Sequence, residues 1–96
     1  MRLSFSPDAR KDLLSITRFI SADNPARAIS FSEELTRACM ELADQPERYA
    51  TLPRYGKRGV RRRPYGSYSI IYDVGAGVVH IVRIISSARN LDELLD

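Results

Sequence analysis

Two helix-start signals follow each other closely in the first half of the chain. Ser6-Pro7-Asp8 supplies a hydroxyl that can cap free N–H groups, a proline suited to the first helical position, and an acid at the positive end of the helix dipole. Asn24-Pro25 repeats the signal. Apolar residues at helical spacing follow each signal, and the second run stops before Pro46. The first stripe is Ala9, Leu13, Ile16 and Ile20, and the second is Ala28, Phe31, Leu35, Ala38 and Leu42. Two helices joined so tightly predict an αα-hairpin.

The pattern changes from helical spacing to alternation in the second half of the chain. Residues 46–59 contain Pro46, Pro53, Gly56 and Gly59, which indicate an irregular connection. From Val60 onward the residues favour strands, with a turn at residues 75–77 before the β-branched run 78–85, which we expect to be buried on both faces.

Two shorter segments complete the predicted order of elements. Residues 2–5 predict one more strand, and the leucines at 91, 94 and 95 suggest a short C-terminal helix or tail. The sequence therefore predicts a single α+β domain over residues 1–96 with the order β-α-α-β-β-β. In this fold a small antiparallel sheet packs against the N-terminal αα-hairpin.

Length and composition exclude several classes of protein. A chain of 96 residues can bury one core without disulfides or metals, and Cys39 has no second cysteine to pair with. The N-terminus lacks the apolar stretch of a signal peptide, and His80 and Arg83 interrupt the longest apolar strand. We therefore expect a cytoplasmic protein without a membrane span, a metal or another cofactor.

The positive charge is concentrated in one short segment. The net charge is +3, and six of the fifteen cations lie in an acid-free window: Arg54, Lys57, Arg58, Arg61, Arg62 and Arg63. Such a window can attract phosphates or an acidic protein partner. On a strand, Arg61 and Arg63 point one way and Arg62 the other, so part of the triplet can equally be a solvated edge. Tyr65 and Tyr68 are close enough in sequence to stack on bases beside it.

Three further side chains near the C-terminus are candidates for a site. Arg83 lies in an apolar strand, where a cation is costly unless it is paired, so it either forms a structural ion pair with Asp12 or belongs to a site. His80 lies in mid-strand, and a hydrogen-bonded structural role is favoured over catalysis. Arg89 follows the last strand, where loops often carry function, although a solvated arginine is the simpler alternative.

The chain resembles the RelE/ParE superfamily of bacterial type II toxins. No phosphate-binding loop or familiar hydrolase motif is present. The resemblance covers nearly the whole chain, and the final segment is most similar to the ParE branch. The segments that carry it are Ser6–Ile16, Asn24–Ala28, Gly59–Arg61, Tyr68–Tyr72 and Arg83–Arg89.

The RelE branch, which cleaves messenger RNA without a metal, differs from this chain at two positions. Ser69 stands where RelE has an arginine, and Leu95 stands where it has a late tyrosine. Arg89 is retained, and Arg62 falls near one of the RelE strand lysines. One electrostatic donor is commonly worth about 10²–10³ in rate. We therefore expect a binding inhibitor with no catalytic residues.

For the ParE branch, the resemblance implies a toxin that is neutralised by a ParD-like antitoxin and usually proposed to act on DNA gyrase. The alternatives are a RelE-like ribosome-dependent endonuclease and a non-toxic basic interaction domain. Many ParE-like chains have a histidine where this chain has Ser86. Candidate target contacts are Arg61, Arg62, Arg63, Arg83 and Arg89, and direct contact with nucleic acid is a weaker expectation. Candidate antitoxin contacts, expected where a partner segment crosses the αα-hairpin and the sheet, are Phe19, Ile20 and Ile29.

Overall fold

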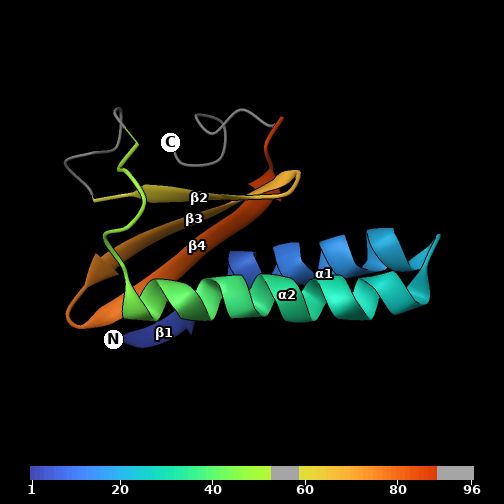
Figure 1. The fold of residues 1–96 in the computed structure, drawn as a ribbon, viewed down its shortest axis with the longest axis horizontal. Coiled ribbons are helices and arrows are strands. Elements are labelled where there is room, and N and C mark those ends of the chain that lie inside the picture. Colours follow the sequence, from blue (N-terminus) through green and yellow to red (C-terminus); the bar gives the residue numbers. More distant parts are fainter. Residues whose placement is uncertain (53–58, 89–96) are drawn as a thin grey trace.

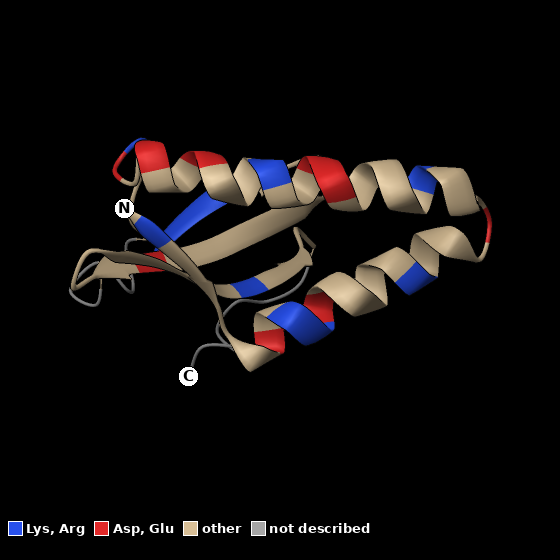
Figure 2. Cartoon of the chain, turned by 90° about the horizontal axis from the view of Figure 1, so that it is seen from below, with Lys and Arg blue, Asp and Glu red and all other residues tan. Residues whose placement is uncertain are grey.

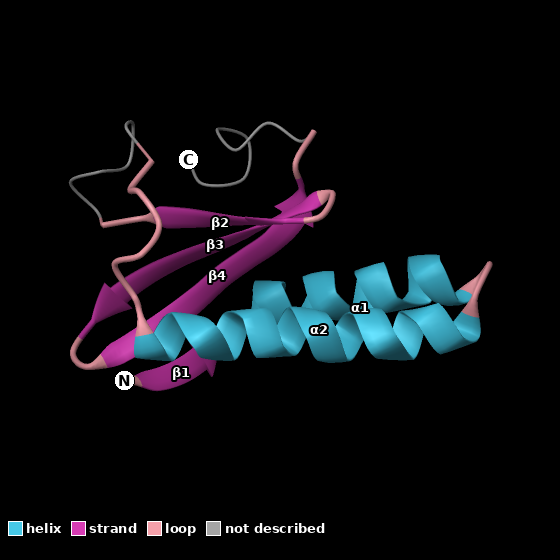
Figure 3. Ribbon diagram, viewed as in Figure 1, coloured by secondary structure: helices cyan, strands magenta, loops and turns pink. Residues whose placement is uncertain are grey.

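The computed structural model describes residues 1–52 and 59–88, which form two helices and four strands. The elements are β1 (Arg2–Phe5), α1 (Pro7–Ser21), α2 (Pro25–Asp44), β2 (Arg61–Tyr65), β3 (Tyr68–Gly75) and β4 (Val78–Ser86). Figures 1 and 3 show the two helices side by side as one layer against the sheet. The predicted α+β class, the order of elements and the αα-hairpin are confirmed. The C-terminal helix or tail suggested at 91–95 lies outside the described residues.

Both helix-start signals cap as the sequence predicts. The Ala9 N–H donates to the Ser6 hydroxyl at 2.9 Å, and the Arg27 N–H donates to Asn24 Oδ1 at 3.0 Å. Ser6 and Asn24 both have extended backbone, so each chain segment enters its helix at the residue that caps it.

The sheet is mixed, with the strand order β1-β4-β3-β2. β3 pairs antiparallel with β2 and β4, but β1 pairs parallel with β4. The expectation of an antiparallel sheet is therefore wrong for this one pair. The residue pattern of a short strand does not encode the direction of its neighbour, and parallel strands need a longer connection, which the helical hairpin and the β2–β3 pair provide here.

Helix α1 covers the edge of β4 beyond the end of β1. The Ser6 backbone N–H donates to the Ile81 carbonyl at 2.9 Å, and the Ser6 hydroxyl donates to the Val82 carbonyl at 2.7 Å. The Ile84 N–H donates to Asp12 Oδ2 at 2.9 Å. The N-cap residue Ser6 and the Asp12 side chain of α1 thus satisfy backbone groups that a longer β1 would otherwise have paired.

The core lies mainly between the helices and the facing side of the sheet. Leu35, Cys39 and Leu42 of α2 meet the strand residues Tyr72 and Ile81 there. A second cluster on the opposite face consists of Val60, Ile71 and Ile85, with Leu52 and Val82 packed against it. Ile81 belongs to the first cluster and Ile85 to the second. β4 therefore buries side chains on both of its faces, as predicted for residues 78–85. Within the described residues, no helix is long and apolar enough to cross a membrane.

Cys39 is expected to report on unfolding. It is fully buried, and burial raises the pKa of its thiol to about 12, so little reactive thiolate forms near pH 8. A thiol reagent should label the native chain slower than the guanidinium-denatured chain by about 10²-fold or more. Timed labelling followed by mass spectrometry measures this ratio, and comparable rates in the two states would contradict the buried position of Cys39.

Candidate functional site

The arginine triplet makes up the first three residues of strand β2, and its side chains alternate between the two faces of the sheet. Arg61 pairs with Tyr72 and Arg63 with Ile70, on the face that carries the helices. Arg62 pairs with Ile71, whose side chain belongs to the cluster on the opposite face. The predicted alternation is confirmed, and it divides the triplet between two surfaces.

Two members of the triplet connect the sheet to neighbouring segments. Arg61 Nη1 donates to the Tyr49 carbonyl at 2.6 Å, and Arg63 Nη1 donates to the Ala38 carbonyl at 2.6 Å. Arg63 also pairs with Glu41 at 3.3 Å and lies 5.3 Å from the centre of the Tyr49 ring. The Arg63 side chain is only 12% exposed. Arg61 and Arg63 are thus occupied inside the fold.

Arg62 has a different environment on the outer face of the sheet. Its Nε donates to Ser69 Oγ at 2.8 Å, and Ser69 Oγ lies 3.1 Å from Ser87 Oγ. Ser69 is 2% exposed and belongs to the same face as Ile71 and Ile85. Ser69, which stands where the RelE branch has a cation, is therefore a buried neutral acceptor for Arg62.

Arg83 forms the ion pair with Asp12 that was one of its two predicted roles. Arg83 Nε donates to Asp12 Oδ2 at 2.7 Å, and Nη2 donates to Oδ1 at 2.8 Å. The Arg83 and Asp12 side chains are 18% and 14% exposed. Hydrogen bonding to Asp12 raises the pKa of Arg83, although burial opposes this shift. This two-point ion pair therefore connects α1 to β4.

The nearby aromatic side chains and His80 also have internal partners. The Tyr65 and Tyr68 rings lie 6.0 and 5.7 Å from the ring of Phe31 on α2. They pack against the helix layer, so the structure does not favour the predicted stacking on bases. His80 Nδ1 lies 2.9 Å from Asp73 Oδ1, which agrees with the hydrogen-bonded role expected for it.

The three candidate antitoxin contacts do not form one surface. Phe19 is 74% exposed and lines a cleft between α1 and the ends of β3 and β4. Ile29 is 63% exposed and lies on α2 one helical turn before Ser32, on the other side of the hairpin. Ile20 is partly buried and packs against the core. The structure thus gives exposed positions to Phe19 and Ile29 and places them on different faces.

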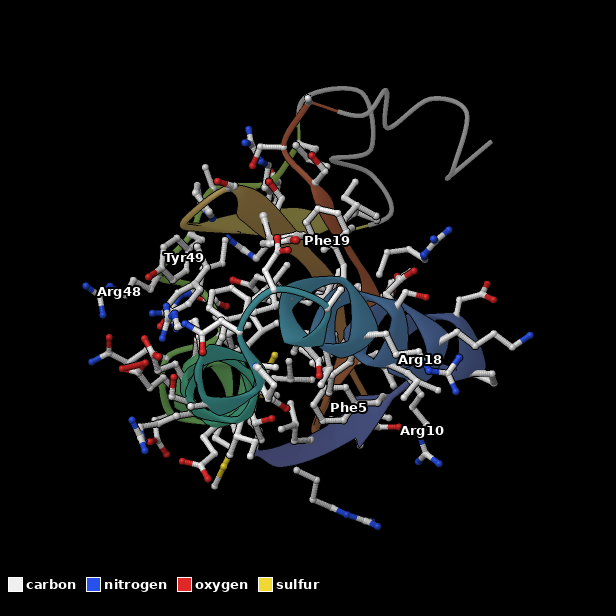
Figure 4. All side chains as sticks on the ribbon, turned by 90° about the vertical axis from the view of Figure 1, so that its right-hand side faces the viewer. Phe5, Arg10, Arg18, Phe19, Arg48 and Tyr49 are labelled. Atoms are coloured by element: carbon white, nitrogen blue, oxygen red, sulfur yellow. The ribbon has the colours of Figure 1, made fainter. Side chains whose placement is uncertain are left out.

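A groove between the two helices opens on the side where Ile29 lies. It has a volume of about 590 Å³ and is lined by Phe5, Arg10, Leu13, Leu14, Thr17, Ser32 and Thr36. Leu14 is 50% exposed, and sequence reasoning did not single it out, although it is an apolar residue outside the core stripe of α1. Figure 4 shows Phe5 and Arg10 on one side of α1 and Phe19 on another. Figure 2 shows basic and acidic residues on both helices, so the charge is not confined to β2.

The remaining candidate features are five residues near the loop and the C-terminus, metal ligands and groups with a shifted pKa. Arg89, Leu95 and the cations at 54, 57 and 58 lie outside the described residues. In the described part of the chain, no three His, Cys, Asp or Glu side chains gather as metal ligands. The pKa is clearly shifted for Glu34, Cys39, Tyr72 and Arg83, in each case away from neutrality. These shifts do not supply a general acid or base poised near pH 7.

The comparisons with known proteins agree with the fold and with one family. The family model described as "ParE toxin of type II toxin-antitoxin system, parDE" matches residues 3–91. A chain of the solved structure "Chromosomal ParDE TA system from P. aeruginosa" is similar in fold, with a TM-score of 0.76 and 20% sequence identity. The similarity covers 90% of this chain and 95% of that chain. No curated protein matches the sequence.

Proposed function

The chain belongs to the ParE toxin family of type II toxin-antitoxin systems, and we propose on that basis that it inhibits DNA gyrase by binding. We further propose that a ParD-like antitoxin holds it inactive. Gyrase is supported by the resemblance of the final segment, Arg83–Arg89, to the ParE branch, for which gyrase is the usual proposed target. The antitoxin is supported by the family, whose systems pair a ParE toxin with a ParD partner.

The environment of Ser69 is the observation that favours binding over RNA cleavage. Cleavage without a metal needs cations that stabilise charge on the phosphate as the transition state forms. Ser69 instead offers a neutral hydroxyl, which is buried and engaged with Arg62 and Ser87. Arg61, Arg63 and Arg83 are held by carbonyl or carboxylate partners, so Arg62 is the one described candidate cation at this position, without the second cation that the RNA-cleaving branch has there. These contacts support an inhibitor that acts through its surface.

The antitoxin surface that we propose is the groove between α1 and α2. Leu13 and Leu14 give the groove an apolar wall, and Arg10 places a cation in its lining. An amphipathic segment with an acidic side would match both features. The cleft beside Phe19 is smaller, at about 350 Å³, and we treat it as the comparison surface.

The purified chain, freed of its antitoxin, is expected to inhibit supercoiling of relaxed plasmid by gyrase or to trap cleaved DNA. Adding the antitoxin should restore supercoiling. Ribosome-bound messenger RNA treated with the same preparation should remain intact, because Ser69 and Leu95 stand where the RNA-cleaving branch has an arginine and a tyrosine.

Gel electrophoresis of the plasmid and primer extension on the messenger RNA measure the two arms of this experiment. Codon-specific cleavage of the messenger with gyrase unaffected would overturn the proposal in favour of the ribonuclease. Growth of cells expressing the chain alone tests the third alternative, since a non-toxic interaction domain would leave growth unchanged.

A further inference from the structure

Arg62 is distinguished from the other described candidate arginines by what its guanidinium contacts. Arg61 and Arg63 each donate a terminal N–H to a backbone carbonyl, and Arg83 forms a two-point pair with Asp12. Arg62 donates through Nε to the neutral Ser69 hydroxyl. No described residue accepts from Arg62 Nη1 or Nη2, and no described carboxylate lies within ion-pair distance of it.

The Nε contact fixes the direction in which the guanidinium points. Ser69 is itself held at 3.1 Å from Ser87 Oγ and is 2% exposed, so it is a restrained acceptor. A guanidinium held at Nε keeps its full charge and presents Nη1 and Nη2 as a pair of parallel donors. This pair matches the two oxygens of a carboxylate or phosphate, and little side-chain entropy remains to be lost on binding.

We infer that Arg62 is the cation of this toxin that contacts its target, that Ser69 and Ser87 position it, and that the group it binds is a carboxylate on the target protein. This inference rests on the proposed function, because it takes gyrase as the target. Among the candidate arginines in the described part of the chain, it assigns the target contact to Arg62 alone. Ser69 and Ser87 orient the Arg62 side chain and do not contact the target.

A protein carboxylate suits the observations better than a DNA phosphate. DNA binding gains affinity from many phosphate contacts, because each one releases counterions. Three of the four described candidate arginines are occupied inside the fold. Tyr65 and Tyr68 pack on Phe31, so they do not form a stacking platform. A single oriented and partly buried guanidinium is instead typical of a contact between two proteins.

The test compares four variants in the gyrase supercoiling assay. Arg62→Ala should raise the concentration needed for half-inhibition by about 30-fold or more, because a charged hydrogen-bonded contact across an interface is lost. Arg62→Lys should remain within about threefold of Arg62→Ala, because an ammonium group lacks the paired donors. Ser69→Ala should raise the concentration needed for half-inhibition by about three- to tenfold, because Arg62 loses its hydrogen-bond acceptor but keeps its charge. Arg18→Ala, which removes the same charge from an exposed position on α1, is the matched control and should match the unmodified chain.

Three further measurements decide how each outcome is interpreted. Antitoxin affinity should be unchanged in Arg62→Ala, and the melting temperature should fall no further than in Ser69→Ala, which removes the same hydrogen bond, so loss of a contact is separated from loss of the fold. The inference is wrong if Arg62→Ala reaches half-inhibition at the same concentration as the unmodified chain. It is also wrong if Arg62→Lys inhibits as well as the unmodified chain. If the chain binds duplex DNA without gyrase and Arg62→Ala weakens that binding, the group that Arg62 contacts is a phosphate. The assignment of a protein carboxylate would then be wrong.

The inference can fail separately from the proposed function. If the unmodified chain does not inhibit gyrase, the proposed function is wrong, whatever the variants do. Growth arrest in cells then tests Arg62 without assuming a target. Relief of arrest by Arg62→Ala, and not by Arg18→Ala, would support the target contact, and arrest by both variants would overturn it.

Discussion

Replacing Asp12 with alanine is expected to destabilise the fold by about 3–5 kcal/mol, because it leaves the Arg83 charge buried without its partner. Asp12 accepts two hydrogen bonds from Arg83 and one from the Ile84 backbone N–H. Domains of this size are stable by about 5–15 kcal/mol in total. The variant should therefore unfold at a much lower urea concentration, as followed by circular dichroism.

Two companion variants separate the charge from the hydrogen bonds. Asp12→Asn keeps an acceptor for the Ile84 N–H but removes the negative charge, so its loss should be smaller. Combining Asp12→Ala with Arg83→Met removes the unpaired charge and should recover part of the loss, because replacing both members of a buried pair with apolar groups is often nearly neutral. A loss below about 1 kcal/mol in Asp12→Ala would mean that the pair contributes no more than an exposed ion pair does.

Placing glutamate at Leu14 and Ile29 together is expected to weaken antitoxin binding by about 10²-fold or more. Both side chains are at least half exposed, so the fold should tolerate the change. Hot-spot residues at the centre of an interface each contribute about 2 kcal/mol or more, and we expect Leu14 and Ile29 to be among them. An acidic antitoxin segment would also meet the new charges with repulsion. Titration calorimetry on the purified toxin and antitoxin measures the affinity.

The matched control is Phe19→Glu, which adds the same charge to an exposed apolar position on the other face of the hairpin. Its affinity for the antitoxin should stay within a few-fold of the unmodified chain. If Phe19→Glu abolishes binding while the Leu14 and Ile29 variant binds normally, the antitoxin lies in the cleft between α1 and the sheet. Ile20 is left unchanged in both variants because it packs against the core.

The helices and the order of elements along the chain could be predicted because local signals determine them. The Ser6 and Asn24 caps and the apolar stripes identify the helical hairpin, and the alternation across β2 separates Arg62 from its neighbours. The parallel pairing of β1 with β4 could not be predicted, since a four-residue strand carries no signal for the direction of its partner.

The candidate site was less accessible from the sequence, because it depends on contacts between distant residues. The Asp12–Arg83 pair was one of two alternatives, and only the packing of α1 on β4 decides between them. The sequence spacing of Arg61 and Arg63 shows their side of the strand, but the carbonyls of Tyr49 and Ala38 that occupy them come from other elements. Phe19 and Ile29 are both apolar and lie near the hairpin turn. Their angular positions around the helix axes nevertheless place the two side chains on different faces of the hairpin.

The position of β4 has a consequence for how the toxin is made. β4 is the last strand in the part of the chain that the structure describes, but it lies between β1 and β3 in the sheet, and the hydrogen bond from Ser6 to Val82 spans 76 residues. Such long-range closure is slow compared with the formation of the local helical hairpin. Translation proceeds at about 5–20 residues per second, so the nascent helices exist for seconds before β4 is available to complete the sheet. The outer face that carries Arg62 and Ser87 therefore cannot assemble before β4 and Ser87 have been synthesised, and a nascent chain that stops short of β4 lacks it.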